Sequence, residues 1–178
     1  QEGVKNALIF CNRKRDVDIV HKSLQKHGYN SATLHGDMSQ PARMETMTKF
    51  KADEIALLVC SDVAARGLDI DDLGHVFNFD VPIHAEDYVH RIGRTGRAGR
   101  SGKSVTFVYG RDIYRLEAIE RYTRQVVKRM PIPSLEDVEG RKADKVFNQV
   151  RSSLETGSFK RHDDLVDRLL DVGHTPTD

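Results

Sequence analysis

Cations and glycines each recur at every third position in the segment His90-Arg91-Ile92-Gly93-Arg94-Thr95-Gly96-Arg97-Ala98-Gly99-Arg100-Ser101-Gly102-Lys103. No acidic residue interrupts this run. A buried core would not accept so many guanidinium groups without partners. Arginine beside glycine suits a site where a forked donor meets a phosphate while the backbone stays close. A flexible basic loop is the plain alternative, and the sequence on either side of the run decides between them.

Short apolar runs alternate with helix-like segments along the first 130 residues. The apolar runs predict strands at 6–11, 31–34, 55–60, 75–79 and 103–109. Helical spacing predicts helices at 13–27, 39–50, 85–92 and 111–127, with a polar loop at 61–72. Met44, Met47 and Phe50 are expected on the inner face of the second helix. This alternation predicts an α/β fold, a parallel sheet with helices on both faces.

Polar segments adjoin the ends of several predicted strands and helices. They are Asn12-Arg13, His35-Gly36-Asp37, Ser61-Asp62 and the arginine run. Ligands of parallel sheets bind beyond the carboxyl ends of the strands. We therefore expect these segments to converge on one rim of the sheet.

The sequence contains arginines suited to a nucleotide but no cradle for one. Gly102-Lys103-Ser104 imitates the end of a phosphate-binding P-loop, but position 97 is Arg and a strand, not a helix, should follow. The dinucleotide pattern G-x-G-x-x-G is also absent. The pattern therefore predicts half of a composite site, in which arginines stabilise the phosphates of a nucleotide held elsewhere.

The spacing of residues alone does not decide the roles of two further segments. In Ser61-Asp62-Val63-Ala64-Ala65-Arg66-Gly67-Leu68-Asp69-Ile70, Asp69 could accept a ribose hydroxyl and Gly67 would let the backbone approach, but a loop with capping aspartates fits as well. Gln40 and Arg43 share one face at a helix start, where phosphate is favoured, or form a solvated turn.

Metal and thiol chemistry have little support. His35-Gly36-Asp37 lacks further zinc ligands and could be a simple turn. Cys11 and Cys60 each end an apolar run, where a cysteine is usually inert rather than nucleophilic. With two cysteines and no CxxC, the sequence predicts neither a disulfide framework nor a metal site, and it favours a cytoplasmic location.

Composition places the chain among globular proteins. Hydrophobic residues make up 38% of its 178 residues, enough for a core, and the net charge is +1. No apolar run approaches the ~18 residues of a membrane span, so no membrane association is predicted. Residues 134–178 carry ten acidic side chains against seven Lys and Arg, so the positive charge belongs to the preceding part.

A second region follows the prolines of Met130-Pro131-Ile132-Pro133, which cannot continue a helix. We therefore divide the chain into a domain at 1–130 and a helical extension at 131–178. Ser134 and Asp137 resemble a capping box. Helices are predicted at 142–154 and 163–172, with apolar stripes formed by Val146, Phe147, Val150 and Leu154, and by Leu165, Val166, Leu169 and Leu170. These stripes need a partner, either the first domain or a second copy bound through 134–178.

The motifs together resemble those of the DEAD-box RNA helicases. Ser61–Ile70 and His90–Arg97 look like motifs V and VI of that family, and Leu8-Ile9-Phe10-Cys11-Asn12 resembles motif IV. Gln40-Pro41-Ala42-Arg43 resembles the Gln-x-x-Arg motif, with His35-Gly36-Asp37 ahead of it. The resemblance covers about residues 4–127 and implies the second RecA-like domain. The P-loop and the Asp-Glu-Ala-Asp motif belong to the family's first domain and are absent here.

The resemblance also implies roles for individual residues. Arg94 and Arg97 match arginine fingers, and Gly67 and Asp69 match nucleotide contacts. His90 and Arg91 match residues that link the two domains and brace motif V. The positions that match contacts to the RNA backbone are Asn12, Gly36, Asp37, Gln40, Arg43, Ser61 and Asp62. Ser61 stands where the family more often has threonine, and it keeps the hydroxyl. The extension is similar to that of cold-shock DeaD-type bacterial helicases, where a dimerisation module follows.

The sequence thus predicts the C-terminal domain of an ATP-dependent RNA helicase, inactive by itself. Its partners would be RNA, the N-terminal RecA-like domain of the same protein and a second copy. ATP and Mg²⁺ would be held mainly by the N-terminal domain. A RecA-like module that binds RNA or protein without catalysis is the alternative, and linkage to a first domain with a P-loop would discriminate the two.

Overall fold

The computed structural model describes residues 6–66, 70, 73–96, 99 and 101–157. The chain divides into two compact units, Glu2–Lys128 and Arg129–Asp178. Among the described residues, no helix combines the length and the apolar character needed to cross a bilayer.

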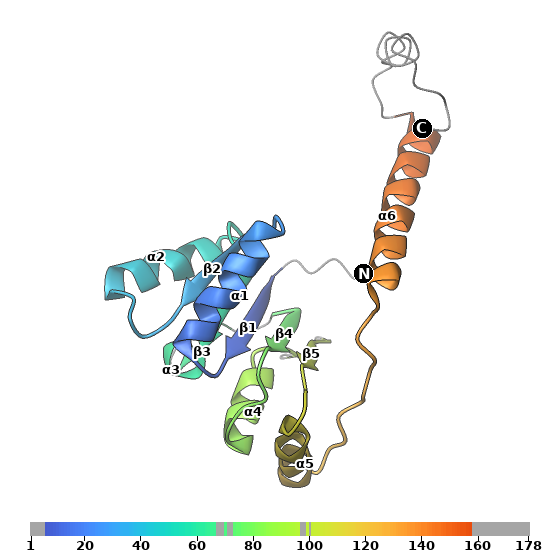
Figure 1. The fold of residues 1–178 in the computed structure, drawn as a ribbon. Coiled ribbons are helices and arrows are strands. Elements are labelled where there is room, and N and C mark those ends of the chain that lie inside the picture. The colour runs from blue at the N-terminus through green and yellow to red at the C-terminus, as the bar shows by residue number, and fades with distance from the viewer. Residues whose placement is uncertain (1–5, 67–69, 71–72, 97–98, 100, 158–178) are drawn as a thin grey trace. The chain divides into compact units, whose positions relative to one another are not determined.

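A five-stranded parallel sheet forms the centre of the first unit, as predicted (Figure 1). The strand order is β2-β3-β1-β4-β5, so the first strand lies in the middle. Its residues are all buried, which explains why that segment is apolar throughout. The strands are β1 (Ala7–Cys11), β2 (Ser31–Leu34), β3 (Leu57–Ser61), β4 (His75–Asn78) and β5 (Lys103–Thr106).

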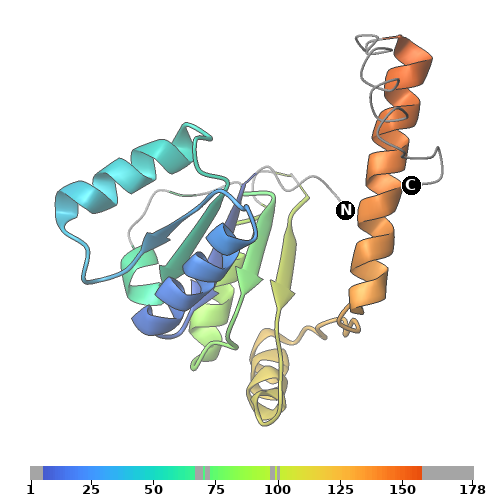
Figure 2. The ribbon, with the colours of Figure 1, turned by 45° about the horizontal axis from the view of Figure 1, so that its top comes forward.

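Helices cover both faces of this sheet (Figure 2). On one face, Val17 and Val20 of α1 pack against Ile9 and Val59. On the other face, α2 contributes Phe50 and α3 contributes Ala64 and Ala65 to the larger core cluster. A third cluster joins α4 and α5 beside the end of β4. The helices are α1 (Lys14–Lys26), α2 (Gln40–Lys51), α3 (Asp62–Ala65), α4 (Ala85–Ile92) and α5 (Asp112–Thr123).

The structure corrects several local predictions. The predicted polar loop at 61–72 begins with the short helix α3, whose alanines are buried. Met44 is 63% exposed, so the inner face of α2 is formed by Met47 and Phe50 without it. Helix α5 ends at Thr123, four residues earlier than predicted, because Arg124 adopts a left-handed conformation with φ of 54°. Strand β5 likewise ends at Thr106 rather than at 109.

The second unit contains the helix α6 (Leu135–Thr156), which begins earlier than the predicted residue 142. A reciprocal capping box starts it: the Ser134 backbone N–H donates to Asp137 Oδ2 at 2.9 Å, and the Asp137 N–H donates to Ser134 Oγ at 3.1 Å. Gly140 is accommodated inside the helix, and Gly157 ends it with φ of 63°. The second helix predicted for the extension, 163–172, lies outside the described residues.

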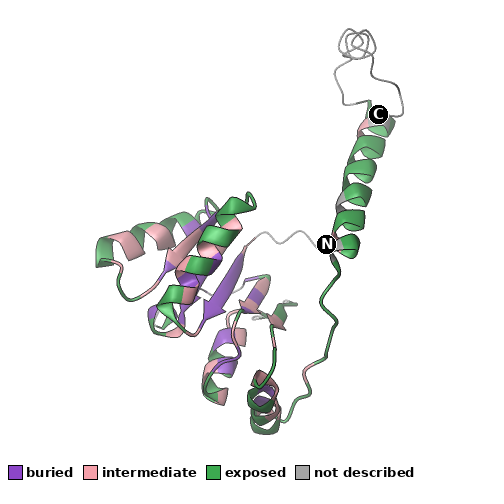
Figure 3. Cartoon of the chain, in the orientation of Figure 1, coloured by how far each residue is buried: buried purple, intermediate pink, exposed green. Residues whose placement is uncertain are grey.

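Much of α6 is exposed within its own unit (Figure 3). The exposed fractions of Val146, Phe147 and Val150 are 59%, 66% and 53%. These residues are four and three positions apart, so they form one stripe on the helix. Three residues of the predicted stripe are therefore exposed, and the described part of the unit does not bury them. The side chain of the fourth, Leu154, lies outside the described part of the structure.

Candidate functional site

The parallel register brings polar residues to one rim of the sheet. Asn12 follows β1, Ser61 ends β3 and Asp62 directly follows it, and Asn78 and Asp80 lie at the end of β4. Because β1 lies between β3 and β4, these three strand ends are adjacent. The rim is the carboxyl edge where ligands of parallel sheets bind.

Arg91 on α4 occupies the centre of this rim, and its side chain is 1% exposed. Its guanidinium makes a bidentate bond with Asp62: Nε lies 2.7 Å from Oδ1 and Nη2 lies 2.6 Å from Oδ2. Nη2 also donates to Asn12 Oδ1 at 2.8 Å. One buried cation thus joins the segments after β1 and β3 to helix α4.

The end of β4 completes the environment of Arg91. Nη1 donates to the carbonyl of Asp80 at 3.0 Å and to Asn78 Oδ1 at 3.3 Å. The guanidinium carbon lies 5.2 Å from the ring centroid of Phe10, within the range of a cation–π interaction. A buried charge is tolerated when it is paired and bonded in this way. We call Arg91, Asp62, Asn12, Asn78 and Asp80 the rim cluster.

Asn12 makes two hydrogen bonds in addition to the one with Arg91. Its side-chain Nδ2 donates to the carbonyl of Val81 at 3.0 Å, and its backbone N–H donates to Asp80 Oδ2 at 2.9 Å.

Burial raises the pKa of the neighbouring Cys11 thiol to about 12, with the nearby Asp80 carboxylate adding to the shift. Such a thiol stays protonated at neutral pH, which argues against the nucleophile hypothesis.

A hollow of about 210 Å³ lies over the rim cluster. Its lining comes from the motif-like segments and from the core, namely Phe10, Asp62, Ala65, Arg66, Asp87, His90, Arg91 and Arg94. Arg66 bridges to Asp87 across it, with Nη2 and Oδ1 3.1 Å apart. Arginine side chains therefore line the hollow above Asp62 and Arg91, whose charges are paired with each other.

The arginine run after α4 is shaped by two of its glycines. Gly96 has φ of 68°, a left-handed conformation that favours glycine. At Gly102, a Cβ atom would lie 2.9 Å from the Gly96 Cα and would overlap the Thr95 side chain. The chain thus folds back closely on itself, and Leu73 N–H donates to the carbonyl of Arg94 at 3.1 Å. This bond holds the backbone at Arg94 near the described residues that follow α3.

A second group of predicted residues surrounds the start of α2. Lys14 Nζ lies 2.7 Å from Asp37 Oδ2, and this hydrogen-bonded ion pair lowers the pKa of Asp37 and raises that of Lys14. His35 Nε2 lies 3.4 Å from Asp18 Oδ1. The loop between β2 and α2 is therefore tied to α1 at two points.

Arg43 connects this group to the rim. Its Nη2 donates to the carbonyl of Ala64 in α3 at 3.1 Å, and its buried Nε has no hydrogen-bond partner among the described residues. Arg43 thus braces the segment that follows β3, and it lies one turn after the exposed Gln40 on α2.

The structure brings part of the predicted set together. Asn12, Asp62 and Arg91 are in direct contact, His90 and Arg94 line the same hollow, and Ser61 is buried just below it. Gly36, Asp37 and Gln40 form the separate group at α2. Three predicted nucleotide-binding residues, Gly67, Asp69 and Arg97, lie outside the described residues.

Sequence reasoning missed several residues of the site. Asn78 is fully buried and donates to Thr106 Oγ1 at 3.0 Å while it accepts from Arg91. An asparagine within the otherwise apolar run His75–Phe79 was the available signal, as was Asp80 directly after it. Asp87 and Lys14 carried no signal in the sequence, because single charges on a helix are ordinarily solvated.

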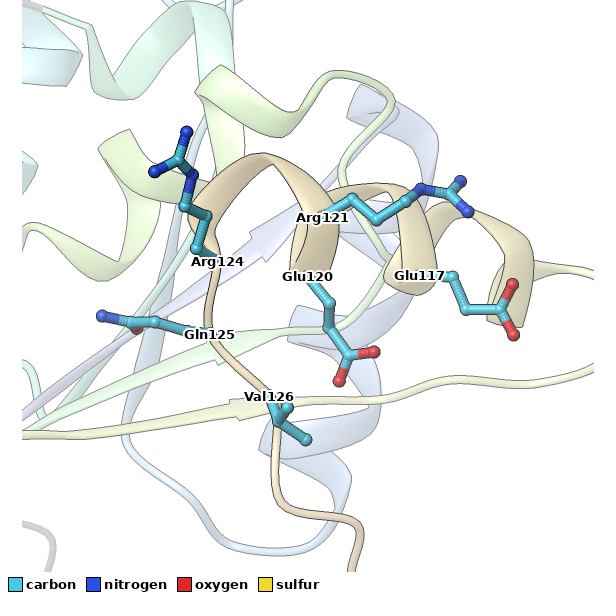
Figure 4. Close-up of a pocket in the computed structure, with 6 residues that line it drawn as sticks. All are labelled: Glu117, Glu120, Arg121, Arg124, Gln125 and Val126. Atoms are coloured by element: carbon cyan, nitrogen blue, oxygen red, sulfur yellow. The ribbon is translucent and has the colours of Figure 1, made fainter.

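Another hollow of the first unit, of about 350 Å³, lies at the end of α5 (Figure 4). It is lined by Glu117, Glu120, Arg121, Arg124, Gln125 and Val126, none of which was predicted to be functional. Its acidic and basic side chains point in different directions rather than toward one point (Figure 4). We therefore place the candidate site at the rim cluster.

The described residues hold no group of three or more His, Cys, Asp or Glu side chains placed to bind a metal ion. Asp62 is engaged by Arg91, and Asp87 by Arg66. This part of the chain thus offers cationic donors suited to phosphate.

Comparison with known proteins places this geometry in a family. Residues 1–99 match the family model described as helicase conserved C-terminal domain. The chain belongs to this family, and within it to the DEAD-box proteins. It is 42% identical over 173 residues to the ATP-dependent RNA helicase CshA of Limosilactobacillus reuteri, covering 96% of this chain and 34% of that protein. It is 40% identical over 168 residues to the ATP-dependent RNA helicase DeaD of Buchnera aphidicola, covering 94% of this chain and 28% of that protein.

A solved DEAD-box structure shares the fold. The E. coli DEAD-box protein SrmB, in its complex with the regulator of ribonuclease activity A, superimposes with a TM-score of 0.70 and 37% identity, covering 74% of this chain and 78% of that one. The DEAD-box chain described here spans about a third of the length of these curated relatives. The match with CshA continues through most of the extension, because it covers nearly the whole chain.

Proposed function

We propose that this chain is the second RecA-like domain of an ATP-dependent RNA helicase and supplies arginine fingers to a nucleotide held by a first domain. The observation that carries the proposal is the rim cluster, with its buried Arg91, beneath a hollow that Arg94 lines. The charge of Arg91 is satisfied within the domain, and Arg94 follows α4 and lines the hollow. An arginine held beside a rigid, fully bonded cluster is suited to stabilise the negative charge that develops on the phosphate during phosphoryl transfer.

The nucleotide would be shared between the two domains. Arg94 and Arg97 would reach its terminal phosphate, and Gly67 and Asp69 would contact it from the segment after α3. His90 and Arg91 would transmit the position of the first domain to the rim cluster. Mg²⁺ and the phosphate cradle are assigned to the first domain, as the resemblance to the DEAD-box helicases implies. ATP supplies the phosphoryl group and the binding energy that brings the domains together.

RNA would lie along the residues around α2 and the rim. The candidates are Asn12, Gly36, Asp37, Gln40, Arg43, Ser61 and Asp62. Two structural details refine their roles: both Asp62 oxygens are bonded to Arg91, and Asp37 is paired with Lys14. We therefore assign Asp62 to positioning, and we add Lys14 as a phosphate-attracting group. Contacts of this kind hold the backbone and carry no sequence information.

Backbone contacts would also explain unwinding. RNA bent across the closed domains cannot remain paired, so a short duplex would separate locally. This activity requires both domains. We place the protein in the cytoplasm, on the basis of its two free thiols, Cys11 and Cys60.

The extension would mediate homodimerisation through residues 134–178. The exposed stripe of Val146, Phe147 and Val150 supports this, because a soluble helix seldom leaves such a stripe without a partner. An isologous contact would place the same stripe on both subunits.

RNA-stimulated ATP hydrolysis tests the proposed function. We expect the isolated chain to hydrolyse ATP no faster than buffer, and the complete protein to hydrolyse it with strong stimulation by single-stranded RNA. Turnover by the isolated chain would refute the composite site. A complete protein that binds RNA but shows no stimulated turnover would instead support a non-catalytic binding module.

A further inference from the structure

Helices α3 and α4 meet through two ion pairs of opposite polarity. The buried pair joins Asp62 to Arg91, and the second pair joins Arg66 to Asp87. Asp62 and Arg66 are four positions apart, as are Asp87 and Arg91, so each segment presents one acid and one base on the same side. The pairing is antiparallel, because the first residue of each segment contacts the last residue of the other.

Two small, buried residues lie between the charged ends of the segment 62–66. Ala64 and Ala65 are 1% and 7% exposed, so small side chains separate the two charged ends of the short helix. The two pairs differ in burial, since the side chains of Asp62 and Arg91 are 24% and 1% exposed, whereas those of Asp87 and Arg66 are 17% and 69% exposed. Asp87 is thus a largely buried carboxylate that is paired with a mostly exposed arginine.

The second ion pair lies next to the two segments that are proposed to face the nucleotide. Arg66 is the last described residue before 67–69, and Asp87 lies on the helix that leads to Arg94. Both side chains line the hollow over the rim cluster. The first pair holds Asp62, and the bond from Arg43 and the buried alanines hold the middle of the segment 62–66. The second pair fixes its last residue, Arg66, relative to α4.

We propose that Asp87 is a positioning residue, which acts through Arg66 to fix the segment entering 67–69 relative to the arginines that follow α4. This inference rests on the proposed function and adds to it a residue outside the motif-like segments. Asp87 has no assigned contact with nucleotide or RNA. Its effect on the reaction comes from keeping the two nucleotide-facing segments at one separation, and small misplacements of reacting groups reduce rates strongly.

A double-mutant cycle in the complete protein tests this role. The variants are Asp87→Asn, Arg66→Gln and the two combined, with Asp87→Glu as the conservative variant. We expect each single variant to lower kcat for RNA-stimulated ATP hydrolysis about tenfold, while KM for ATP changes less than about threefold. Because both residues act through one bond, the double variant should also lose about tenfold rather than a hundredfold. Asp87→Glu should recover most of the activity.

A second measurement does not depend on catalysis. The backbone N–H of Arg66 donates to the carbonyl of Asp62 at 3.0 Å. In the chain described here, Asp87→Asn and Arg66→Gln should each speed hydrogen exchange of the Arg66 amide about threefold, as expected for a partly exposed pair. Exchange in α2 should not change, and the midpoint of thermal unfolding should stay within about 2 °C.

The outcomes separate the two hypotheses. If the wild-type complete protein lacks RNA-stimulated turnover, the proposed function fails, and the exchange measurement still decides whether Asp87 fixes the segment. If turnover is present but the single variants match wild type, or if their losses multiply in the double variant, the positioning role is overturned. Unchanged exchange at Arg66 in both single variants overturns it as well.

Discussion

Arg91 at the rim of the sheet and Phe147 on α6 depart from ordinary burial in opposite directions. Arg91 carries a charge and is 1% exposed, whereas Phe147 is apolar and 66% exposed. Five hydrogen bonds to the ends of three strand segments satisfy Arg91 inside its own unit. Phe147 has no comparable burial among the described residues. The first unit thus completes its own site floor, whereas the helix of the second needs another surface.

The two regions are therefore stabilised by different kinds of interaction. Replacing a buried ion pair by apolar residues can be neutral, but removing one partner leaves the other charge buried and unpaired. A substitution that removes one member of the ion pair in the rim cluster should therefore destabilise the first unit. The stripe on α6 gains stability only when water is removed from it, so its contribution depends on association.

The largest effect is expected from Arg91→Met. This change leaves Asp62 without its bidentate partner and frees the acceptors of Asn12 and Asn78. Loss of one member of a buried pair should lower the free energy of unfolding by about 3–5 kcal/mol. Urea unfolding followed by the amide signals of β1 would measure it. The exposed Arg111→Met is the matched control, and equal stability of the two variants would show that the rim cluster is not the floor of the site.

A smaller effect is expected from the double change Phe147→Ser and Val150→Ser. These residues contribute little to the stability of either isolated unit, so the unfolding of the first unit should be unchanged. Self-association should weaken by at least about tenfold, which corresponds to ~1.4 kcal/mol. Sedimentation equilibrium would detect it, with Gln149→Ser as the control. A wild-type chain that stays monomeric at high micromolar concentration would remove the dimer hypothesis, and a dimer that persists in a chain ending at Pro133 would move the interface to the first unit.

Arg43 stands between the two extremes, because it is half-buried and bonded to Ala64. In the complete protein, Arg43→Ala should weaken RNA binding about equally on all sequences and make its salt dependence shallower. Arg43→Lys keeps the charge but loses the forked geometry, so it should preserve the salt slope. Filter binding at several salt concentrations would measure both. A loss confined to one RNA sequence would argue for base recognition instead.

The smallest effect is expected from Ser134→Ala at the start of α6. The Ser134 hydroxyl accepts from the Asp137 N–H and donates to its carboxylate, which lowers the pKa of Asp137. Removing the cap should cost about 1 kcal/mol of helix stability. Hydrogen exchange in the first turn of α6 should speed up by about fivefold, whereas exchange in β1 should not change. No difference between the two regions would show that the cap contributes nothing.

Much of the fold could be predicted from the sequence, because its strands are short apolar runs and their alternation with helices is regular. The parallel direction of the strands followed from this alternation, and β2 and α4 have the predicted bounds. Helix α3 was missed, since four residues are too few to show a period. The early start of α6 was missed because Gly140 weakens the helical pattern near its beginning.

The candidate site was predicted less completely. The motif-like segments led to Asn12, Asp62 and Arg91, but their mutual contacts depend on the strand order, which no local pattern contains. Asn78 and Asp80 became visible as parts of the site only when β4 was placed beside β1. Asp87 required the crossing of α3 and α4, which joins residues 21 positions apart.

The turnover of the complete protein with Arg94→Ala tests the central claim most directly. Arg94 lines the hollow above the rim cluster, and its side chain is proposed to meet the terminal phosphate of ATP. By analogy with arginine fingers, RNA-stimulated turnover at saturating ATP should fall by ~10³-fold or more, and Arg97→Ala should behave alike. ATP and RNA binding should remain measurable in both variants. Turnover near the wild-type value in both would contradict the account.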